Sequence, residues 1–279
     1  YREGGSHRIV DLVACPVLHP ALAALIAPLR AFVAAHGPKG MVGIDLTLAD
    51  QGVEANVANL PLDGLGPTEA ALDFARNQGL ARLSFDQGYG PETVWEPEPV
   101  TVTLAGVSVG LPPGAFLQAT ADAEQRMTAD AAEWLAGARI VADLFAGLGT
   151  FAFALREGRK VLAIEAERAA HLACKAAGAR TGGQVLALHR DLFRVPLQPE
   201  ELNRFDAVLL DPPRAGARAQ VAEIARSTLS RVVYVSCNPS SWARDAAVLA
   251  AAGFRLAKLR PVGQFRWSTH VELVSLFER

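Results

Sequence analysis

The stretch ARIVADLFAGLGT, residues 138–150, decides the fold of this chain. Its apolar run predicts a buried strand, and the glycine-containing turn AGLGT ends that strand before a helix begins. The segments KVLAIEAE, QVLALHRD, FDAVLLDPPR, RVVYVSCNP and VELVSLFER repeat the strand pattern, mostly with helical spacing between them. Strands that are buried on both faces and alternate with helices are typical of an α/β protein with a doubly wound, mostly parallel sheet.

Residues 1–115 have a different pattern. Residues 20–36 have the apolar spacing of a helix, whereas residues 41–50 and 52–60 alternate apolar and polar side chains on either side of a turn. This alternation predicts an antiparallel hairpin. The breaker cluster LPPGAF marks a boundary, so we expect a smaller α+β domain with antiparallel strands at 1–115 and the doubly wound domain at 116–279.

The composition restricts the class of protein. With 51% hydrophobic and 20% charged residues among 279, the chain has an ordinary globular balance. It contains no apolar run of about 18 residues and no secretory signal pattern, so we expect no membrane span. Its cysteines, Cys15, Cys174 and Cys237, are too few and too widely spaced for a disulfide framework, which favours a cytoplasmic location. Because the chain starts with Tyr1 rather than Met, we expect a processed or truncated form of a longer parent.

The glycine turn predicts a nucleoside-binding site. Gly147 and Gly149 follow a strand and precede a helix, where backbone amides can approach a ligand. Glu165 ends the next strand, about 20 residues after Asp143, which is where an acid holds a pair of ribose hydroxyls. Asp191 ends the third strand, so three consecutive strands carry an acid at the edge where such sheets bind ligands. A plain tight turn is the alternative.

The spacing of the turn also indicates the kind of cofactor. Ala152 occupies the position of the third glycine in the dinucleotide pattern, so the turn favours a mononucleoside-like cofactor such as S-adenosylmethionine over NAD. We expect Phe145 and Thr150 to border its adenosine and methionine parts.

The turn DPPR, residues 211–214, ends the fourth strand of the series. Two prolines cannot extend a central strand, so a rigid loop is expected. Asp211 either caps that loop or offers acceptors to the donor edge of a nucleic-acid base or to the amine of the cofactor.

Cys237 stands at the junction of a strand and a helix. Asn238 is a good N-cap and Pro239 suits the first helical position, so a helix is predicted to start there. The positive end of that helix is expected to lower the pKa of Cys237 and favour a nucleophilic thiolate. The alternative is a buried structural thiol, the role that we expect for Cys174.

A thiolate beside a methyl donor has a specific use. Adding the thiolate to carbon 6 of uracil makes carbon 5 nucleophilic toward the methyl group, and a base must afterwards remove the carbon-5 proton. In WSTHVELV, Glu272 is the candidate base, and His270 precedes it by two residues and is expected on the same face of a strand.

Six segments together give a specific match to one family: FLQAT, DLFAGLGTF, AIEAE, LLDPPRAGA, VVYVSCNPSSWARD and THVEL. They resemble the RNA uracil-C5 methyltransferases, which make 5-methyluridine in tRNA and 23S rRNA. The resemblance implies a Rossmann-like methyltransferase fold, S-adenosylmethionine as cofactor, Cys237 as the nucleophile and Glu272 as the base. Cofactor binding is expected at Gln118, Phe145, Gly147, Gly149, Thr150, Glu165, Asp191 and Asp211, and substrate binding at Asp211, Arg214, Asn238 and His270.

The segment GSHRIVDLVACPVLHP, residues 5–20, is similar to the part of the rRNA-type members that carries the fourth cysteine ligand of an iron–sulfur cluster. The matching residue is Cys15. One cysteine cannot hold a cluster of the four-cysteine type. The cluster and the N-terminal RNA-binding domain of that subgroup would therefore belong to a longer parent, or Cys15 is an ordinary thiol.

The expected partner is RNA, in particular 23S rRNA, with a flipped or single-stranded uridine, and the protein is expected to act as a monomer. Since the net charge is only −2, binding would need a local basic face. Candidate phosphate contacts are Arg214, Arg218, Arg244, Arg255, Lys258, Arg260 and Arg266, and candidate stacking residues are Trp242, Phe265 and Trp267. The alternatives are a tRNA uridine-C5 or RNA cytosine-C5 methyltransferase, a small-molecule methyltransferase, or a non-catalytic RNA-binding module. A cytosine enzyme would be expected to carry a cysteine in the DPPR turn.

Overall fold

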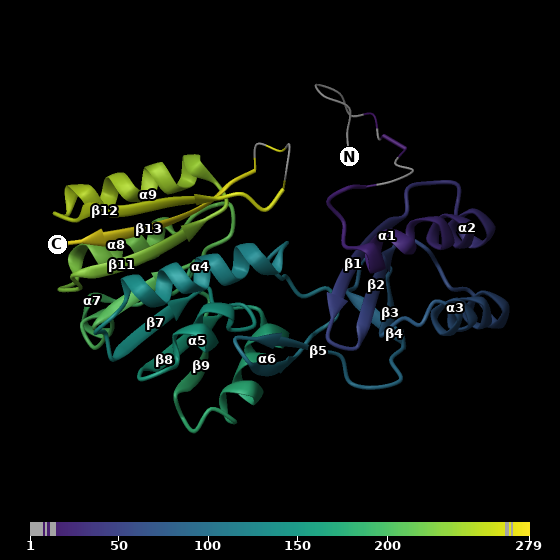
Figure 1. Ribbon diagram of the computed structural model, residues 1–279, viewed down its shortest axis with the longest axis horizontal. Helices are drawn as coiled ribbons and strands as arrows, with labels where there is room; N and C mark the ends of the chain where they lie inside the picture. Colours follow the sequence, from purple (N-terminus) through teal and green to yellow (C-terminus); the bar gives the residue numbers. More distant parts are fainter. Residues whose placement is uncertain (1–7, 9, 12–14, 266–267, 269) are drawn as a thin grey trace. The chain divides into compact units, whose positions relative to one another are not determined.

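The computed structural model describes residues 8, 10–11, 15–265, 268 and 270–279. They form two compact units, Tyr1–Val100 and Thr101–Arg279 (Figure 1).

The division between the units precedes the breaker cluster from which we expected a boundary at residue 115. It places the hairpin of β5 (Thr101–Leu104) and β6 (Val107–Gly110) in the second unit. Arg156 donates to the carbonyl oxygen of Ala105 at 2.9 Å, and Arg180 donates to that of Ser108. These two side chains hold the hairpin to the larger unit.

The first unit contains a four-stranded sheet in the order β1-β2-β3-β4 and helices packed against it. Strands β1 and β2 form the antiparallel hairpin that the alternating pattern predicted, β2 and β3 are parallel, and β3 and β4 are antiparallel. The elements are α1 (Pro20–Ala24), α2 (Ile26–His36), β1 (Gly43–Ala49), β2 (Gly52–Ala58), α3 (Leu65–Asn77), β3 (Arg82–Asp86) and β4 (Pro91–Trp95). The helix expected over residues 20–36 is thus two helices that meet at Leu25.

The second unit is built on a seven-stranded sheet in the order β12-β13-β11-β10-β7-β8-β9. Only β13 runs against its neighbours, so the doubly wound, mostly parallel α/β sheet is confirmed. The strands are β7 (Ile140–Leu144), β8 (Lys160–Glu165), β9 (Val185–His189), β10 (Ala207–Leu210), β11 (Arg231–Ser236), β12 (Arg255–Val262) and β13 (Glu272–Glu278).

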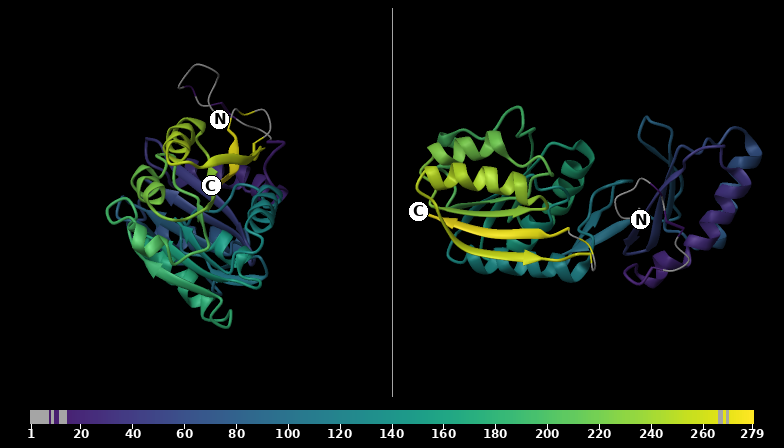
Figure 2. Two further views of the ribbon diagram at one scale, coloured as in Figure 1. Left: turned by 90° about the vertical axis from the view of Figure 1, so that its left-hand side faces the viewer. Right: turned by 90° about the horizontal axis from the view of Figure 1, so that it is seen from above.

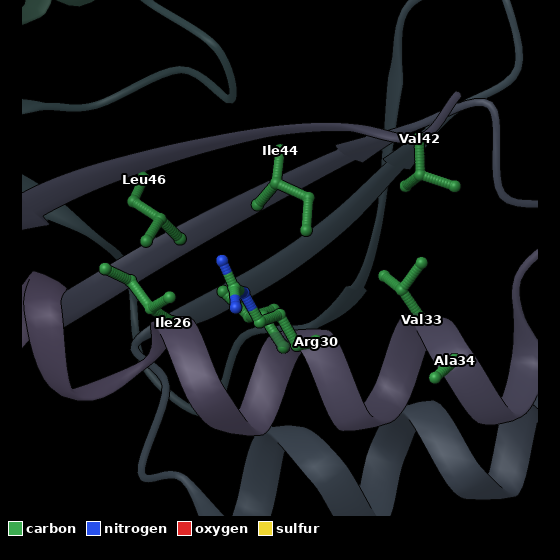
Figure 3. Close-up of a pocket in the computed structure, with 8 residues that line it drawn as sticks. Ile26, Arg30, Val33, Ala34, Val42, Ile44 and Leu46 are labelled. Carbon is green, nitrogen blue, oxygen red and sulfur yellow. The ribbon is translucent and has the colours of Figure 1, made fainter. Parts of the chain in front are cut away.

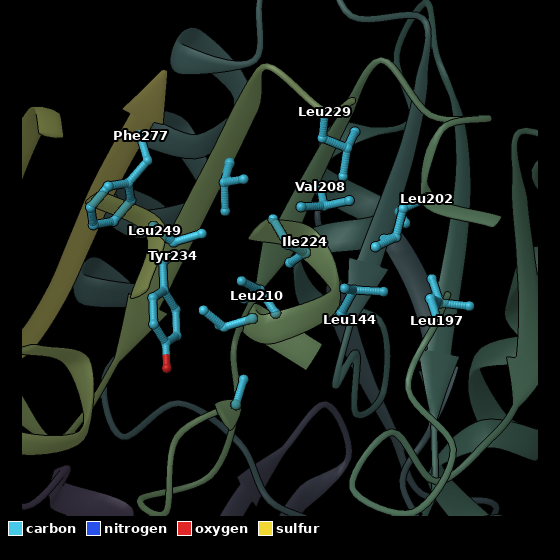
Figure 4. Packing of buried hydrophobic residues seen from close by; sticks show 14 of the residues in the cluster. Leu144, Leu197, Leu202, Val208, Leu210, Ile224, Leu229, Tyr234, Leu249 and Phe277 are labelled. Carbon is cyan, nitrogen blue, oxygen red and sulfur yellow. The ribbon is translucent and has the colours of Figure 1, made fainter. Parts of the chain in front are cut away.

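Helices cover both faces of this sheet (Figure 2). Those on one face are α4 (Ala121–Trp134), α5 (Thr150–Leu155) and α6 (Arg168–Gly178), and those on the other are α7 (Pro199–Leu202), α8 (Arg218–Arg226) and α9 (Pro239–Ala251). Leu144, Leu210 and Tyr234 are register partners on neighbouring strands, so their side chains point to the same face of the sheet. They pack there with Ile224 of α8 and Leu249 of α9 (Figure 4). The close packing of this core fixes the strand ends that carry the site.

Candidate active site

The carboxyl ends of β7, β8, β10 and β11 meet at one edge of the sheet, and β13 begins at that edge because it is antiparallel. A cavity of about 700 Å³ lies there, a size usual for cofactor sites. It brings together most of the residues that the sequence singled out: Gln118, Phe145, Gly147, Thr150, Glu165, Asp211, Arg214, Cys237 and Glu272. Gly149, Asp191, Asn238, His270 and Cys15 lie outside its lining.

The turn after β7 is shaped by residues with positive φ. Phe145 has φ 66° and Gly147 has φ 55°, and a Cβ atom built on Gly147 meets nothing within 4 Å. The Gly147 amide donates to the Glu165 carboxylate at 2.8 Å, and the amides of Ala166 and Glu167 donate to its other oxygen at 2.8 and 2.7 Å. The turn and the acid are thereby held together at the cavity wall.

Gly149 is needed for packing. It is the N-cap of α5 with φ 96°, and an added Cβ would lie 2.9 Å from the Cys174 sulfur and 2.7 Å from the Phe153 ring. Cys174 is buried, and burial raises its pKa to about 12, as expected of a structural thiol.

Asp143 lies behind the turn and is fully buried. Among the described residues, no donor reaches either carboxyl oxygen with hydrogen-bond geometry. Burial and the nearby Asp211 carboxylate raise its pKa to about 8, and the Ala152 amide offsets only part of this effect. A buried carboxyl group without a well-formed hydrogen bond is unusual, and this one adjoins a cavity wall of glycine and acidic residues. The residues present therefore fit a nucleoside cofactor with hydroxyl and amino groups.

Cys237 and Glu272 meet at the ends of two paired strands. Ser236 of β11 is the partner of Leu273 of β13, so the next positions along the antiparallel ladder, Cys237 and Glu272, face each other. Both residues line the cavity. The sequence could not show this pairing, because it depends on the insertion of β13 between β11 and β12.

The expected lowering of the Cys237 pKa is wrong. The helix does begin at Pro239, with the Asn238 side chain accepting from the Ser240 amide at 3.1 Å. Burial and the carboxylates of Glu272 and Asp211 nevertheless raise the pKa of Cys237, and Arg214 lowers it only in part. The thiol is therefore neutral in the free protein at neutral pH.

Both carboxyl groups near the thiol hold protons more tightly than usual. Burial raises the pKa of Glu272, against a hydrogen bond from Gln264 that lowers it. Burial and the Glu272 charge raise the pKa of Asp211 to about 7. Such shifts cluster at functional sites.

Asn238 and Asp191 use their side chains within the protein. Asn238 donates to the carbonyl oxygen of Arg214 at 2.9 Å, which joins the two loops beside the cavity. The Asp191 carboxylate accepts the amides of Phe193 and Arg194 at 2.9 and 3.3 Å and orders the turn after β9. Ligand binding by these two residues stays a prediction.

His270 is exposed and lies before β13, so strand alternation does not place it beside Glu272. Its ring centroid is 6.2 Å from that of Phe265. Arg266 and Trp267 lie outside the described residues. Trp242 donates to the Ser275 hydroxyl at 2.9 Å and packs near Phe277, which is a structural role.

Several of the candidate phosphate contacts have acidic partners. Arg260 lies 2.6 Å from Asp130 and Lys258 lies 3.1 Å from Glu133, so both fasten β12 to α4. Arg244 pairs with Asp245 at 2.8 Å. Arg214 is exposed and lines the cavity, and its contact with a nucleic acid stays a prediction.

Asp245 is a residue that the sequence did not reveal. It is fully buried and accepts the Tyr234 hydroxyl at 2.7 Å, the Ala217 amide at 2.8 Å and the Arg244 guanidinium at 2.9 Å. It joins α9 to the loop that follows the DPPR turn. A buried charge without these donors would be costly. The aspartate that ends SCNPSSWARD therefore indicates a structural role in joining these segments.

A second cavity, of about 480 Å³, lies in the first unit between α2 and β1 (Figure 3). Its lining is apolar apart from Arg30, and Ile44 and Leu46 of β1 face the helix residues Ile26 and Val33 across it. It contains no acid or nucleophile.

Among the described residues, no helix has the length and apolarity to cross a membrane, and no group of His, Cys, Asp or Glu side chains is arranged to hold a metal ion. Cys15 forms no disulfide.

Comparison with known proteins is consistent with this geometry. Residues 107–279 match the family model described as tRNA (uracil-5-)-methyltransferase. An uncharacterized RNA methyltransferase of Zymomonas mobilis is 49% identical over 100% of this chain and 70% of its own length. The 23S rRNA (uracil(1939)-C(5))-methyltransferase of Pectobacterium atrosepticum is 35% identical over 99% of this chain and 63% of its own length.

The fold also matches a solved structure, that of the Pyrococcus abyssi tRNA (uracil-54, C5)-methyltransferase in complex with S-adenosyl-L-homocysteine. The TM-score is 0.76 at 23% identity, over 99% of this chain and 72% of that one. Fold and relatives together define an S-adenosylmethionine-dependent RNA methyltransferase. The chain belongs to the tRNA (uracil-5-)-methyltransferase family.

Proposed function

We propose that the protein transfers a methyl group from S-adenosylmethionine to carbon 5 of a uridine in RNA. The observation that carries the proposal is the pairing of β11 with β13, which sets Cys237 opposite Glu272 in the cavity that contains the turn after β7. Gln118, Phe145, Gly147, Thr150 and Glu165 would hold the cofactor. When bound, S-adenosylmethionine supplies an electrophilic methyl group.

Cys237 and Glu272 would divide the reaction between them. The Cys237 thiol loses its proton to solvent, and its sulfur bonds to carbon 6 of the uracil while the electrons of the carbon 5–carbon 6 double bond move toward the carbonyl at carbon 4. Carbon 5 takes the methyl group, and the electrons of the broken bond stay on the donor sulfur. Glu272 then accepts the carbon-5 proton, the double bond re-forms, and the Cys237 sulfur leaves.

The raised pKa values suit this sequence of steps. A Cys237 thiol with a raised pKa stays mostly protonated, and a protonated thiol is less open to oxidation and side reactions. A Glu272 with a raised pKa is a stronger proton acceptor than an ordinary glutamate, provided that the pH lies above that pKa. Asp211 and Arg214 would contact the uracil edge and the RNA backbone, respectively.

The test uses RNA that contains 5-fluorouridine. Fluorine at carbon 5 cannot be removed as a proton, so we expect a stable adduct between Cys237 and the RNA, identified by mass spectrometry of the peptide. The Cys237→Ala protein should bind the cofactor and form no adduct. Cofactor binding by the wild-type protein without any adduct would instead indicate a non-catalytic RNA-binding module.

We further propose 23S rRNA as the substrate and the cytoplasm as the location. The similarity to the Pectobacterium 23S rRNA enzyme supports rRNA over tRNA. Labelled methyl transfer to 23S rRNA and to tRNA, each isolated from cells that lack this protein, separates the two. Labelling of tRNA alone would overturn the rRNA assignment.

A further inference from the structure

The loop that follows β9 forms one wall of the cavity. Arg190, Leu192 and Phe193 of this loop line the cavity together with Phe145 and Glu165. The centroids of the Phe193 and Phe145 rings are 5.3 Å apart, and the angle between the ring planes is 52°. Phe193 is 47% exposed although it packs against Phe145, so part of its ring is available to a ligand in the cavity.

The order of the strands indicates which end of the cofactor this wall would meet. Glu165, the last residue of β8, has the position of an acid that holds ribose hydroxyls. The sheet places β7 and β10 between β8 and β11, which carries Cys237 at its end, and it places β9 on the other side of β8. The sulfur and methyl group of the cofactor must reach toward Cys237. The purine, on the opposite side of the ribose, is therefore expected beside the loop after β9.

Arg190 closes this loop onto itself. Its Nε atom donates to the carbonyl oxygen of Val195 at 2.7 Å, and one Nη atom donates to that of Pro196 at 2.8 Å. Both Nη atoms donate to the Glu201 carboxylate, at 2.7 and 3.0 Å. These hydrogen bonds lower the pKa of Glu201, so its carboxylate is charged at neutral pH. One planar group thus fastens the start of the loop to its end and to α7.

The loop has two further attachments. The Asp191 carboxylate accepts the amides of Phe193 and Arg194 at 2.9 and 3.3 Å. The buried Gln220 of α8 accepts the Leu197 amide at 2.8 Å and donates to the Leu197 carbonyl oxygen at 3.1 Å. Phe193 therefore lies between fixed points of the loop. A side chain that is held in place before a ligand arrives loses little conformational freedom on binding.

We propose that Arg190 is a positioning residue for the cofactor, because it joins the loop after β9 to Glu201 and so holds the Phe193 ring against the purine. The inference rests on the proposed function, which sets the direction of the cofactor in the cavity. Arg190 acts through the loop, since all three of its guanidinium nitrogens donate to Val195, Pro196 or Glu201. Lysine cannot replace it, because one ammonium nitrogen cannot make the paired contact with a carboxylate and reach two carbonyl oxygens as well.

Three single variants and one double variant test this role. Arg190→Lys and Glu201→Gln weaken the fastening of the loop, and Phe193→Ala removes the ring itself. Glu201 lies outside the cavity lining, so its variant affects a ligand only through the loop. The double variant combines Arg190→Lys with Phe193→Ala. Arg226→Lys, in an ion pair with Glu223 on the exposed side of α8, is the matched control.

The binding of S-adenosylhomocysteine is measured by titration calorimetry, and turnover is measured at saturating concentrations of both substrates. Loss of one base stack costs about tenfold in affinity, which is the expected effect of Phe193→Ala. Arg190→Lys and Glu201→Gln should weaken binding by about fivefold or more, with turnover at saturation within about twofold of wild type. The losses should overlap in the double variant, whose affinity should stay within about twofold of that of Phe193→Ala. Arg226→Lys should match wild type in both assays.

Two results would overturn the proposal. Wild-type affinity in Arg190→Lys and Glu201→Gln would show that the fastening of the loop does not matter to the cofactor. Additive losses in the double variant would show that Arg190 does not act through Phe193. Failure of the proposed function is a separate result, because the wild-type protein would then form no adduct with 5-fluorouridine RNA while the binding comparison still tests Arg190.

Discussion

The Asn238 side chain donates a hydrogen bond to the carbonyl oxygen of Arg214, with 2.9 Å between the two atoms. The same amide caps α9 through its oxygen, which accepts the Ser240 N–H. The loop that carries Cys237 and the loop that carries Asp211 are therefore joined by one side chain. In the proposed reaction the Cys237 thiol and the Asp211 carboxyl group act on the same ring, and this hydrogen bond keeps their two loops together.

The role of Asn238 can be measured by removing its two hydrogen bonds in turn. Asn238→Asp keeps the helix cap and loses the donor to Arg214, so thermal stability should hardly change while turnover falls by about tenfold. Asn238→Ala loses both bonds and should also lose about 1 kcal/mol of unfolding free energy. Turnover of Asn238→Asp equal to wild type would show that the link between the loops is not needed.

The two glycines of the turn after β7 should respond differently to alanine. In Gly149→Ala the new methyl group would lie 2.9 Å from the Cys174 sulfur at a φ of 96°, so we expect a loss of about 2–4 kcal/mol in unfolding free energy. In Gly147→Ala nothing lies within 4 Å, and only the backbone cost of about 1 kcal/mol is expected.

Chemical denaturation with and without S-adenosylhomocysteine checks both glycine variants. Gly147→Ala should weaken ligand binding more than stability, because its methyl group points into open space beside the cavity. A Gly147→Ala protein that is less stable than Gly149→Ala would contradict the assigned roles.

Asp143 should make stability depend on pH. Burial raises its folded-state pKa to about 8, whereas an unfolded aspartate has a pKa of about 3.9. The folded state holds the proton more tightly, so the contribution of this group is complete below about pH 4 and is lost as the pH rises to about 8.

Asp143→Asn should remove that dependence. The variant is expected to lose less unfolding free energy between pH 4 and 8 than wild type, as followed by urea unfolding at several pH values. Asp206→Asn is a control of opposite sign, since the amides of Arg139 and Ile140 lower the pKa of Asp206 and its contribution is lost as the pH falls. Parallel wild-type and Asp143→Asn curves would show that Asp143 is ionised in the folded protein.

Asp245 should be among the most costly side chains to truncate. Asp245→Ala leaves the donors of Tyr234 and Ala217 without an acceptor inside the protein, so a loss of about 3–5 kcal/mol is expected. Glu223→Ala removes an ion pair with the exposed Arg226 and should cost less than about 1 kcal/mol. Thermal unfolding of the two variants side by side gives the comparison, and equal melting temperatures would contradict it.

The sheet of the second unit was predictable because most of its strands are apolar runs followed by a turn. The same logic located Glu165, Asp211 and Cys237, since each follows or ends a strand whose place in the sheet is fixed by burial. Strand β4 was not anticipated: its sequence, PETVW, is short, begins with proline and lies on an edge.

The unpredicted parts of the site depend on contacts between distant segments. Gln264 lies in a loop without a recognisable pattern, and only the folded chain brings it to Ala119. The direction of the Cys237 pKa also needed the structure, because a helix N-terminus can be read from Asn238 and Pro239 but the surrounding burial and the facing Glu272 cannot.

Strand β13 enters the sheet between two strands that precede it in the chain. During synthesis on the ribosome, β7, β8 and the turn that joins them emerge well before β13, so a growing chain can form the glycine turn while sulfur and carboxylate are still separate. Under the proposed function, Cys237 would have no base until β13 enters the sheet, and a partly made chain would not complete the reaction.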